Sequence, residues 1–154
     1  MNDLTSSTIS FRGNLTRLIT SPWLRGGVAL AYTAILTVYL LQPHTSPVIA
    51  KPSIPGQPAL SREILRTFGH FVTFGGLTLV WASALSAVWP FRRALVVTVT
   101  VMVIFSAASE WAQSFVRERS ASVEDFTADV LGVLLGAAVV VGVRWIIAWR
   151  TSSP

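Results

Sequence analysis

Four stretches of the chain are long and apolar enough to cross a lipid bilayer as helices. They cover approximately residues 23–41, 68–89, 94–112 and 126–149. About 20 apolar residues in helical form cross a bilayer core. Inside the bilayer the backbone must satisfy its own hydrogen bonds, which only helices and closed barrels achieve. We therefore predict an all-α membrane protein, a bundle of about four transmembrane helices with short loops, in contact with membrane lipids.

The composition supports a membrane protein. Of the 154 residues, 52% are hydrophobic and 12% are charged, and the mean hydropathy is +0.60, which excludes an ordinary soluble domain. The absence of cysteine excludes disulfides, thiolate metal sites and cysteine nucleophiles. The net charge of +5 comes from arginines scattered beside apolar runs. We therefore expect contacts with anionic lipid headgroups and none with nucleic acid.

The spans belong to one transmembrane domain, residues 22–150, which follows a polar tail at residues 1–21. Residues 42–61 contain five prolines and are predicted to form an extended extracytoplasmic loop, because proline lacks the N–H that helices and central strands need. Residues 90–93 are so few that the second and third spans should form an antiparallel hairpin. The long polar lead favours a retained first span over a cleaved signal peptide.

The positions of the basic residues predict an orientation. If the amino terminus lies inside the cell, seven arginines lie on the inner side, and four arginines and one lysine lie on the outer side. Arg92 and Arg93 fall in the shortest loop, where basic residues weigh most in setting topology. We therefore predict a multi-pass protein of the bacterial cytoplasmic membrane with both termini in the cytoplasm.

Polar side chains recur at helical spacing near the ends of the third and fourth spans. Ser106, Glu110 and Gln113 share one helix face, as do Asp125 and Asp129. A helix rises about 1.5 Å per residue, which puts Glu110 about 24 Å above the inner end of its span and Asp129 about 5 Å below the outer end of the next. Both carboxylates therefore belong to one outer layer, where ionisable groups point to function.

The same face of the fourth span continues into Gly132 and Gly136. Glycines four residues apart let helix backbones approach closely in membranes, so we assign these two to helix packing. We expect this face to meet the polar face of the third span.

Two further residues extend the polar cluster. His70 opens the second span at the same level, and Arg119, in the loop before the fourth span, can hold a carboxylate or a phosphate with two parallel hydrogen bonds. Ion pairs that merely clamp the helices are an equally open reading. The imidazole and carboxylates form a conceivable metal-donor set, but no HExxH motif, phosphate-binding loop or catalytic-triad signature accompanies them. We therefore predict neither a metal nor a cofactor, and leave open whether the protein is an enzyme.

These residues resemble the VanZ-like family of small bacterial membrane proteins, which is named for a protein associated with teicoplanin resistance. The resemblance covers residues 68–136 and follows the order and spacing of His70-Phe71, Glu110, Gln113, Arg119, Ser122, Asp125, Gly132 and Gly136. Two positions depart from the family pattern. Arg66 and Thr67 replace a usual Asp-Lys pair, and Asp129 replaces a usual asparagine. The resemblance implies a multi-span protein connected with the cell envelope or antibiotic tolerance.

Three functions remain open at this point. In the leading hypothesis, an outer-facing cluster binds an anionic lipid headgroup or cell-wall precursor and influences glycopeptide sensitivity. Its ligand-binding residues would be His70, Glu110, Gln113, Arg119, Asp125 and Asp129. The second hypothesis is a membrane enzyme with His70 or Glu110 as general base on a lipid-linked substrate. The third is a structural subunit bound to a membrane-protein partner.

Overall fold

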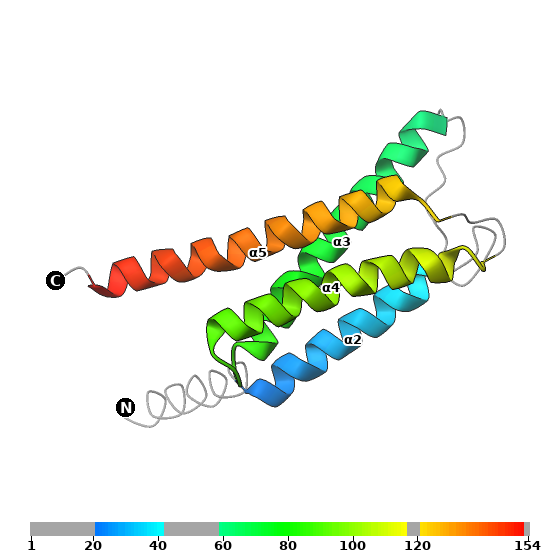
Figure 1. Cartoon of the computed structure of the whole chain (residues 1–154). Helices are drawn as coiled ribbons and strands as arrows, with labels where there is room; N and C mark the ends of the chain where they lie inside the picture. Colours follow the sequence, from blue (N-terminus) through cyan, green and yellow to red (C-terminus); the bar gives the residue numbers. More distant parts are fainter. Residues whose placement is uncertain (1–20, 42–58, 117–120, 153–154) are drawn as a thin grey trace, which may run out of the picture.

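The computed structural model describes residues 21–41, 59–116 and 121–152, and within these ranges the regular structure is entirely helical. The four helices are α2 (Pro22–Leu40), α3 (Ala59–Leu85), α4 (Phe91–Gln113) and α5 (Val123–Ser152) (Figure 1). Each contains a segment long and apolar enough to cross a membrane. The predicted all-α, multi-pass membrane fold is confirmed.

Helix α3 begins earlier than the hydropathy pattern indicates. Its first three residues, 59–61, lie in the stretch that we predicted to be a proline-rich loop, and this part of the prediction is wrong. The last proline of the stretch, Pro58, directly precedes the helix, and a proline there blocks no hydrogen bond of the following turns. The turns before Phe68 are helical but contain three charged residues, Arg62, Glu63 and Arg66, which lower their hydropathy. The rest of that loop and the tail at residues 1–20 lie outside the described residues.

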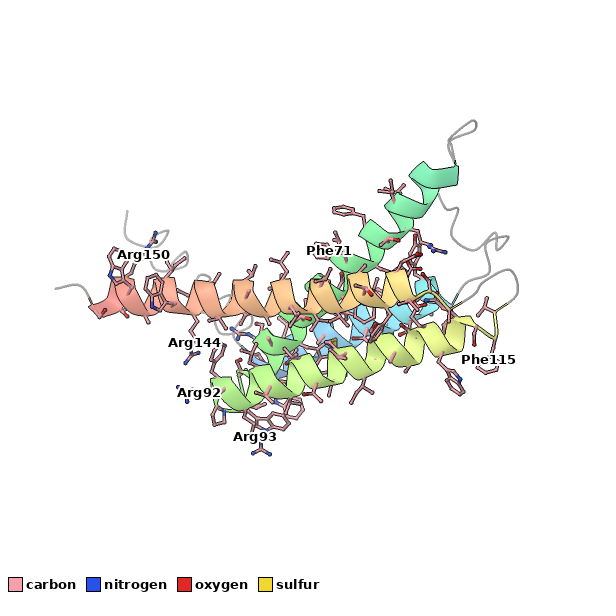
Figure 2. All side chains as sticks on the ribbon, turned by 45° about the horizontal axis from the view of Figure 1, so that its top comes forward. Phe71, Arg92, Arg93, Phe115, Arg144 and Arg150 are labelled. Atoms are coloured by element: carbon pink, nitrogen blue, oxygen red, sulfur yellow. The ribbon has the colours of Figure 1, made fainter. Side chains whose placement is uncertain are left out.

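The four helices run alternately up and down. The start of α2, the α3–α4 turn and the end of α5 lie toward one end of the bundle, and the start of α5 lies toward the other (Figure 1). Several arginines gather toward the first end, where Arg93 stacks on Trp89 at 4.9 Å and Arg144 stacks on Phe91 at 4.5 Å (Figure 2). Arg92, Arg93, Arg144 and Arg150 therefore lie away from the start of α5, whereas Arg66 contacts it through Asp125.

Helices α3 and α5 make the closest contact of the bundle. A Cβ atom added to Gly132 would collide with the backbone carbonyl oxygen of Phe71. One added to Gly136 would lie 2.7 Å from the carbonyl oxygen of Gly75. The glycines thus face α3, whereas the sequence led us to expect α4 opposite this face. Lacking side chains, they allow the two backbones to touch.

Apolar side chains fill the space between the helices beside this contact. Leu40, Phe74, Leu77, Met102 and Val133 form the buried core, and all four helices contribute to it. The indole of Trp81 donates a hydrogen bond of 2.9 Å to the hydroxyl of Thr33, which joins α3 to α2. Many large apolar side chains remain exposed on the outside of the helices, as expected for surfaces that face lipid tails.

Candidate functional site

Polar side chains from α3, α4 and α5 meet in the interior of the bundle near the start of α5. Five of the six predicted ligand-binding residues are buried there, each less than a tenth exposed: His70, Glu110, Gln113, Asp125 and Asp129. The sixth, Arg119, lies outside the described residues. We refer to these five residues, with Arg66, Thr67, Ser106 and Ser122, as the polar cluster.

Asp129 joins the three helices at the centre of the cluster. Its Oδ1 lies 3.0 Å from Nδ1 of His70 on α3, and its Oδ2 accepts a hydrogen bond of 2.7 Å from the hydroxyl of Ser106 on α4. When Asp129 is ionised it can only accept, and this contact then requires the proton on Nδ1 of His70. Asp129 is completely buried. Its two oxygens therefore fix the positions of α3 and α4 relative to α5.

Asp125 lies one turn earlier on α5 and binds the start of the apolar part of α3. Its Oδ2 lies 3.1 Å from Nε of Arg66, and its Oδ1 accepts a hydrogen bond of 3.0 Å from the hydroxyl of Thr67. Its backbone N–H donates to the hydroxyl of Ser122 at 3.2 Å. Ser122 thus caps the first turn of α5, as serine commonly does at the start of a helix, and holds Asp125 in place.

Glu110 faces His70 from α4. Its Oε2 accepts a hydrogen bond of 2.8 Å from the backbone N–H of Ser122. Its Oε1 lies 3.9 Å from Nδ1 of His70 and has no hydrogen-bond partner among the described residues. On the other side of the imidazole ring, Nε2 lies 3.9 Å from Oδ2 of Asp125. His70 is therefore surrounded by three carboxylates.

Gln113 is the last residue of α4 and is also buried. Within the described part of the chain, its amide nitrogen has no hydrogen-bond partner. A buried donor without a partner costs about 1–3 kcal/mol, so this amide is available to a bound group.

The cluster carries an excess of negative charge. With Glu110, Asp125 and Asp129 all ionised and His70 neutral, three negative charges face the one positive charge of Arg66, a sum of −2 for the described residues. Burying unbalanced charge costs free energy, which a bound proton or cation reduces.

The sequence reading left Arg66, Thr67 and Ser106 out of the predicted binding residues. Arg66 stands four residues before His70, a spacing that puts both on one helix face. Extending the second span upstream as a helix would have revealed this relation. The spacing of Ser106 predicted that it shares a face with Glu110 and Gln113, but it was not assigned a binding role, because serines are common within spans.

Four apolar helices surround a buried cluster of one histidine and three carboxylates, and this fold is that of a multi-pass membrane protein. The sequence profile described as VanZ/LLP1 matches residues 13–147, and the chain belongs to this family. Among curated proteins and solved structures, none matches the chain.

Proposed function

We propose that the polar cluster and its rim bind the anionic group of a lipid or lipid-linked cell-wall precursor, and that the protein thereby influences glycopeptide sensitivity. The observation that carries this proposal is the setting of Arg66. Its side chain is 32% exposed, and its Nε lies 3.1 Å from the buried Oδ2 of Asp125. A guanidinium presents its N–H donors in a rigid plane that matches the two oxygens of a carboxylate or phosphate. Asp125 thus orients at the rim a group suited to phosphate or carboxylate.

A groove next to this arginine supports a lipid as the ligand. It is open, has a volume of about 330 Å³ and lies between Thr67 of α3 and the first turns of α5. Val123, Ala128 and Leu131 supply apolar surface along it, and Thr67, Glu124 and Thr127 supply its polar lining. The Thr67 hydroxyl also contacts Asp125. An acyl or prenyl chain in the groove would bring its headgroup to Arg66. Arg119, in the loop before α5, is proposed as a second cation for the same headgroup.

The basic residues support an outward-facing cluster. Arg92, Arg93, Arg144 and Arg150 lie toward the opposite end of the bundle from the start of α5 (Figure 2). Arginines next to spans remain on the cytoplasmic side. On this basis we propose that both termini are cytoplasmic and that the cluster lies at the outer surface of the cytoplasmic membrane, where cell-wall precursors are used.

The test replaces Arg66 by lysine in a host where deletion of the gene changes glycopeptide sensitivity. Lysine keeps the charge but loses the planar pair of donors. Arg66→Lys should be present at normal abundance and fail to restore the wild-type minimum inhibitory concentration. Arg150→Lys, an exposed arginine at the opposite end, is the matched control and should restore it. Full restoration by Arg66→Lys at equal abundance would reject two-pronged recognition at this residue.

Native mass spectrometry distinguishes the two candidate ligands, a membrane phospholipid and a lipid-linked cell-wall precursor. Purified protein would be offered phosphatidylglycerol or a prenyl-linked sugar diphosphate in gentle detergent. Retention of one lipid by the wild type, with loss in Arg66→Lys, identifies the ligand class. Equal retention of both lipids by both proteins contradicts a specific site.

The second candidate function is a membrane enzyme, which the 3.0 Å contact between His70 and Asp129 favours. A carboxylate on one ring nitrogen orients an imidazole for general-base work. Turnover of the labelled sugar diphosphate lipid by the wild type, and its loss in His70→Gln, would establish the enzyme. Binding without turnover would leave the first proposal standing. A membrane-protein partner stays a prediction, to be tested by co-purification.

A further inference from the structure

We propose that His70, Glu110 and Asp129 form a binding site for a divalent metal ion of the zinc type. One side chain comes from each of α3, α4 and α5, and all three are buried. Each offers one ligand atom, and these atoms lie within 4.8 Å of one another. The site concerns the interior of the cluster and does not depend on the headgroup proposed at its rim.

The carboxylates of Glu110 and Asp129 have the same arrangement of contacts. In each, one oxygen is held by the protein: Oε2 of Glu110 by the N–H of Ser122, and Oδ2 of Asp129 by the hydroxyl of Ser106. The other two oxygens point toward Nδ1 of His70, at 3.9 Å for Glu110 and 3.0 Å for Asp129. Oε1 of Glu110 is buried and without a hydrogen-bond partner among the described residues. In each carboxylate, one oxygen is thus held by a hydrogen bond, and the other oxygen is directed at Nδ1 of His70.

The surroundings of His70 fit a metal ligand. A metal-binding histidine usually directs its second ring nitrogen at a carboxylate, which fixes the tautomer and strengthens the ligand. Here Nε2 lies 3.9 Å from Oδ2 of Asp125, on the opposite side of the ring from Glu110 and Asp129. If a metal replaces the proton at Nδ1, the ring proton moves to Nε2 and faces that carboxylate. Asp125 is itself held by Arg66 and Thr67.

The donor set favours zinc over magnesium or calcium. Imidazole suits zinc and related transition metals, whereas magnesium and calcium prefer oxygen alone. Ligand atoms around a tetrahedral zinc at about 2.0–2.1 Å stand about 3.3 Å apart, so no pair has to approach by more than about 1.5 Å. Rotation of the carboxylate ends supplies such a movement without shifting a helix. The ion would also neutralise two of the buried negative charges.

The test measures zinc binding by the purified full-length protein in detergent. The affinity tag used for purification contains no histidine. After treatment with a chelator, the wild type should take up one Zn²⁺ per chain by elemental mass spectrometry, and its Tm should rise with Zn²⁺ but not with Mg²⁺. His70→Gln and Glu110→Gln should each weaken binding by more than about 100-fold. Ser106→Ala, which removes only a supporting hydrogen bond, should weaken it by about 10–100-fold.

Two substitutions are matched controls. His44→Gln removes the other histidine of the chain, and Glu124→Gln removes an exposed carboxylate next to Asp125. Both variants should bind zinc as the wild type does. Arg150→Lys, an exposed arginine at the opposite end of the bundle, should also bind zinc normally. The proposal is overturned if the stripped wild type takes up no zinc, or if His70→Gln and Glu110→Gln bind it as tightly as their controls. If either ligand variant fails to fold, the wild-type stoichiometry and the graded effect of Ser106→Ala decide the question.

Discussion

Replacing Gly132 by alanine should separate α5 from α3. The added Cβ would collide with the carbonyl oxygen of Phe71, and would lie 3.0 Å from its carbonyl carbon and 3.1 Å from the amide nitrogen of Gly75. All three atoms belong to the backbone of α3, so no side-chain rotation relieves the overlap. Optimal separations between carbon atoms are about 3.5–4.0 Å, so the helices would have to move apart by roughly 1 Å.

The magnitude follows from comparison with Gly142, a glycine on the same helix that has nothing within 4 Å of an added Cβ. Alanine gains about 0.5–1 kcal/mol over glycine inside a helix, and both substitutions share this gain. Only Gly132→Ala adds the overpacking cost of about 1–3 kcal/mol. The free energies of unfolding of the two variants should therefore differ by about 1–3 kcal/mol, with Gly142→Ala the more stable.

Thermal unfolding in one detergent, followed by circular dichroism, measures this difference. At about 2–4 °C per kcal/mol for a chain of this length, the Tm of Gly132→Ala should lie about 2–12 °C below that of Gly142→Ala. Gly142→Ala should melt at or above the wild-type temperature. Equal melting of the two variants would refute the backbone contact between α3 and α5.

Two further predictions concern the α2 contact and the topology. Trp81→Phe and Thr33→Val should each lower stability by about 0.6–1.7 kcal/mol, and the double variant should lose little more, because both remove the same hydrogen bond between helices. Additive Tm losses would contradict this. The chain has no cysteine, so single introduced cysteines report cleanly. Ser114→Cys, at the exposed end of α4, should react with a membrane-impermeant thiol reagent in intact cells, and Ser152→Cys, at the exposed end of α5, should not; the reverse pattern would place the cluster in the cytoplasm.

The number and kind of helices could be predicted from the sequence because the bilayer imposes a length and an apolar composition on every span. The start of α3 could not, because Arg62, Glu63 and Arg66 lower the hydropathy of its first turns and the hydropathy pattern misses them. That error had a consequence for the site. Because the predicted helix began only at Phe68, Arg66 was not placed on the helix face of His70. The cation that lies 3.1 Å from Asp125 was therefore missed.

Which helices meet was harder to predict than which residues lie on a face. The spacing of Asp125, Asp129, Gly132 and Gly136 places them along one side of α5, and this alignment is visible in the sequence. It does not say which neighbour lies opposite. In the structure the glycines contact α3, whereas Asp129 contacts both His70 of α3 and Ser106 of α4. Helical periodicity gives a direction for each side chain, but the partner depends on how three helices share the space.

The glycine contact and the polar cluster depend on each other. Gly132 lies three residues after Asp129 on α5, and the Phe71 carbonyl that it touches belongs to the residue after His70 on α3. The backbones must therefore meet within one helical turn of the 3.0 Å contact between His70 and Asp129. A shift of roughly 1 Å at Gly132 would lengthen that contact beyond hydrogen-bonding distance and spread the proposed metal donors. Gly132→Ala should consequently bind zinc more weakly than Gly142→Ala at a temperature where both are folded. Equal zinc affinity despite a lower Tm would show that the cluster tolerates movement of α5, and would reject this mechanical link.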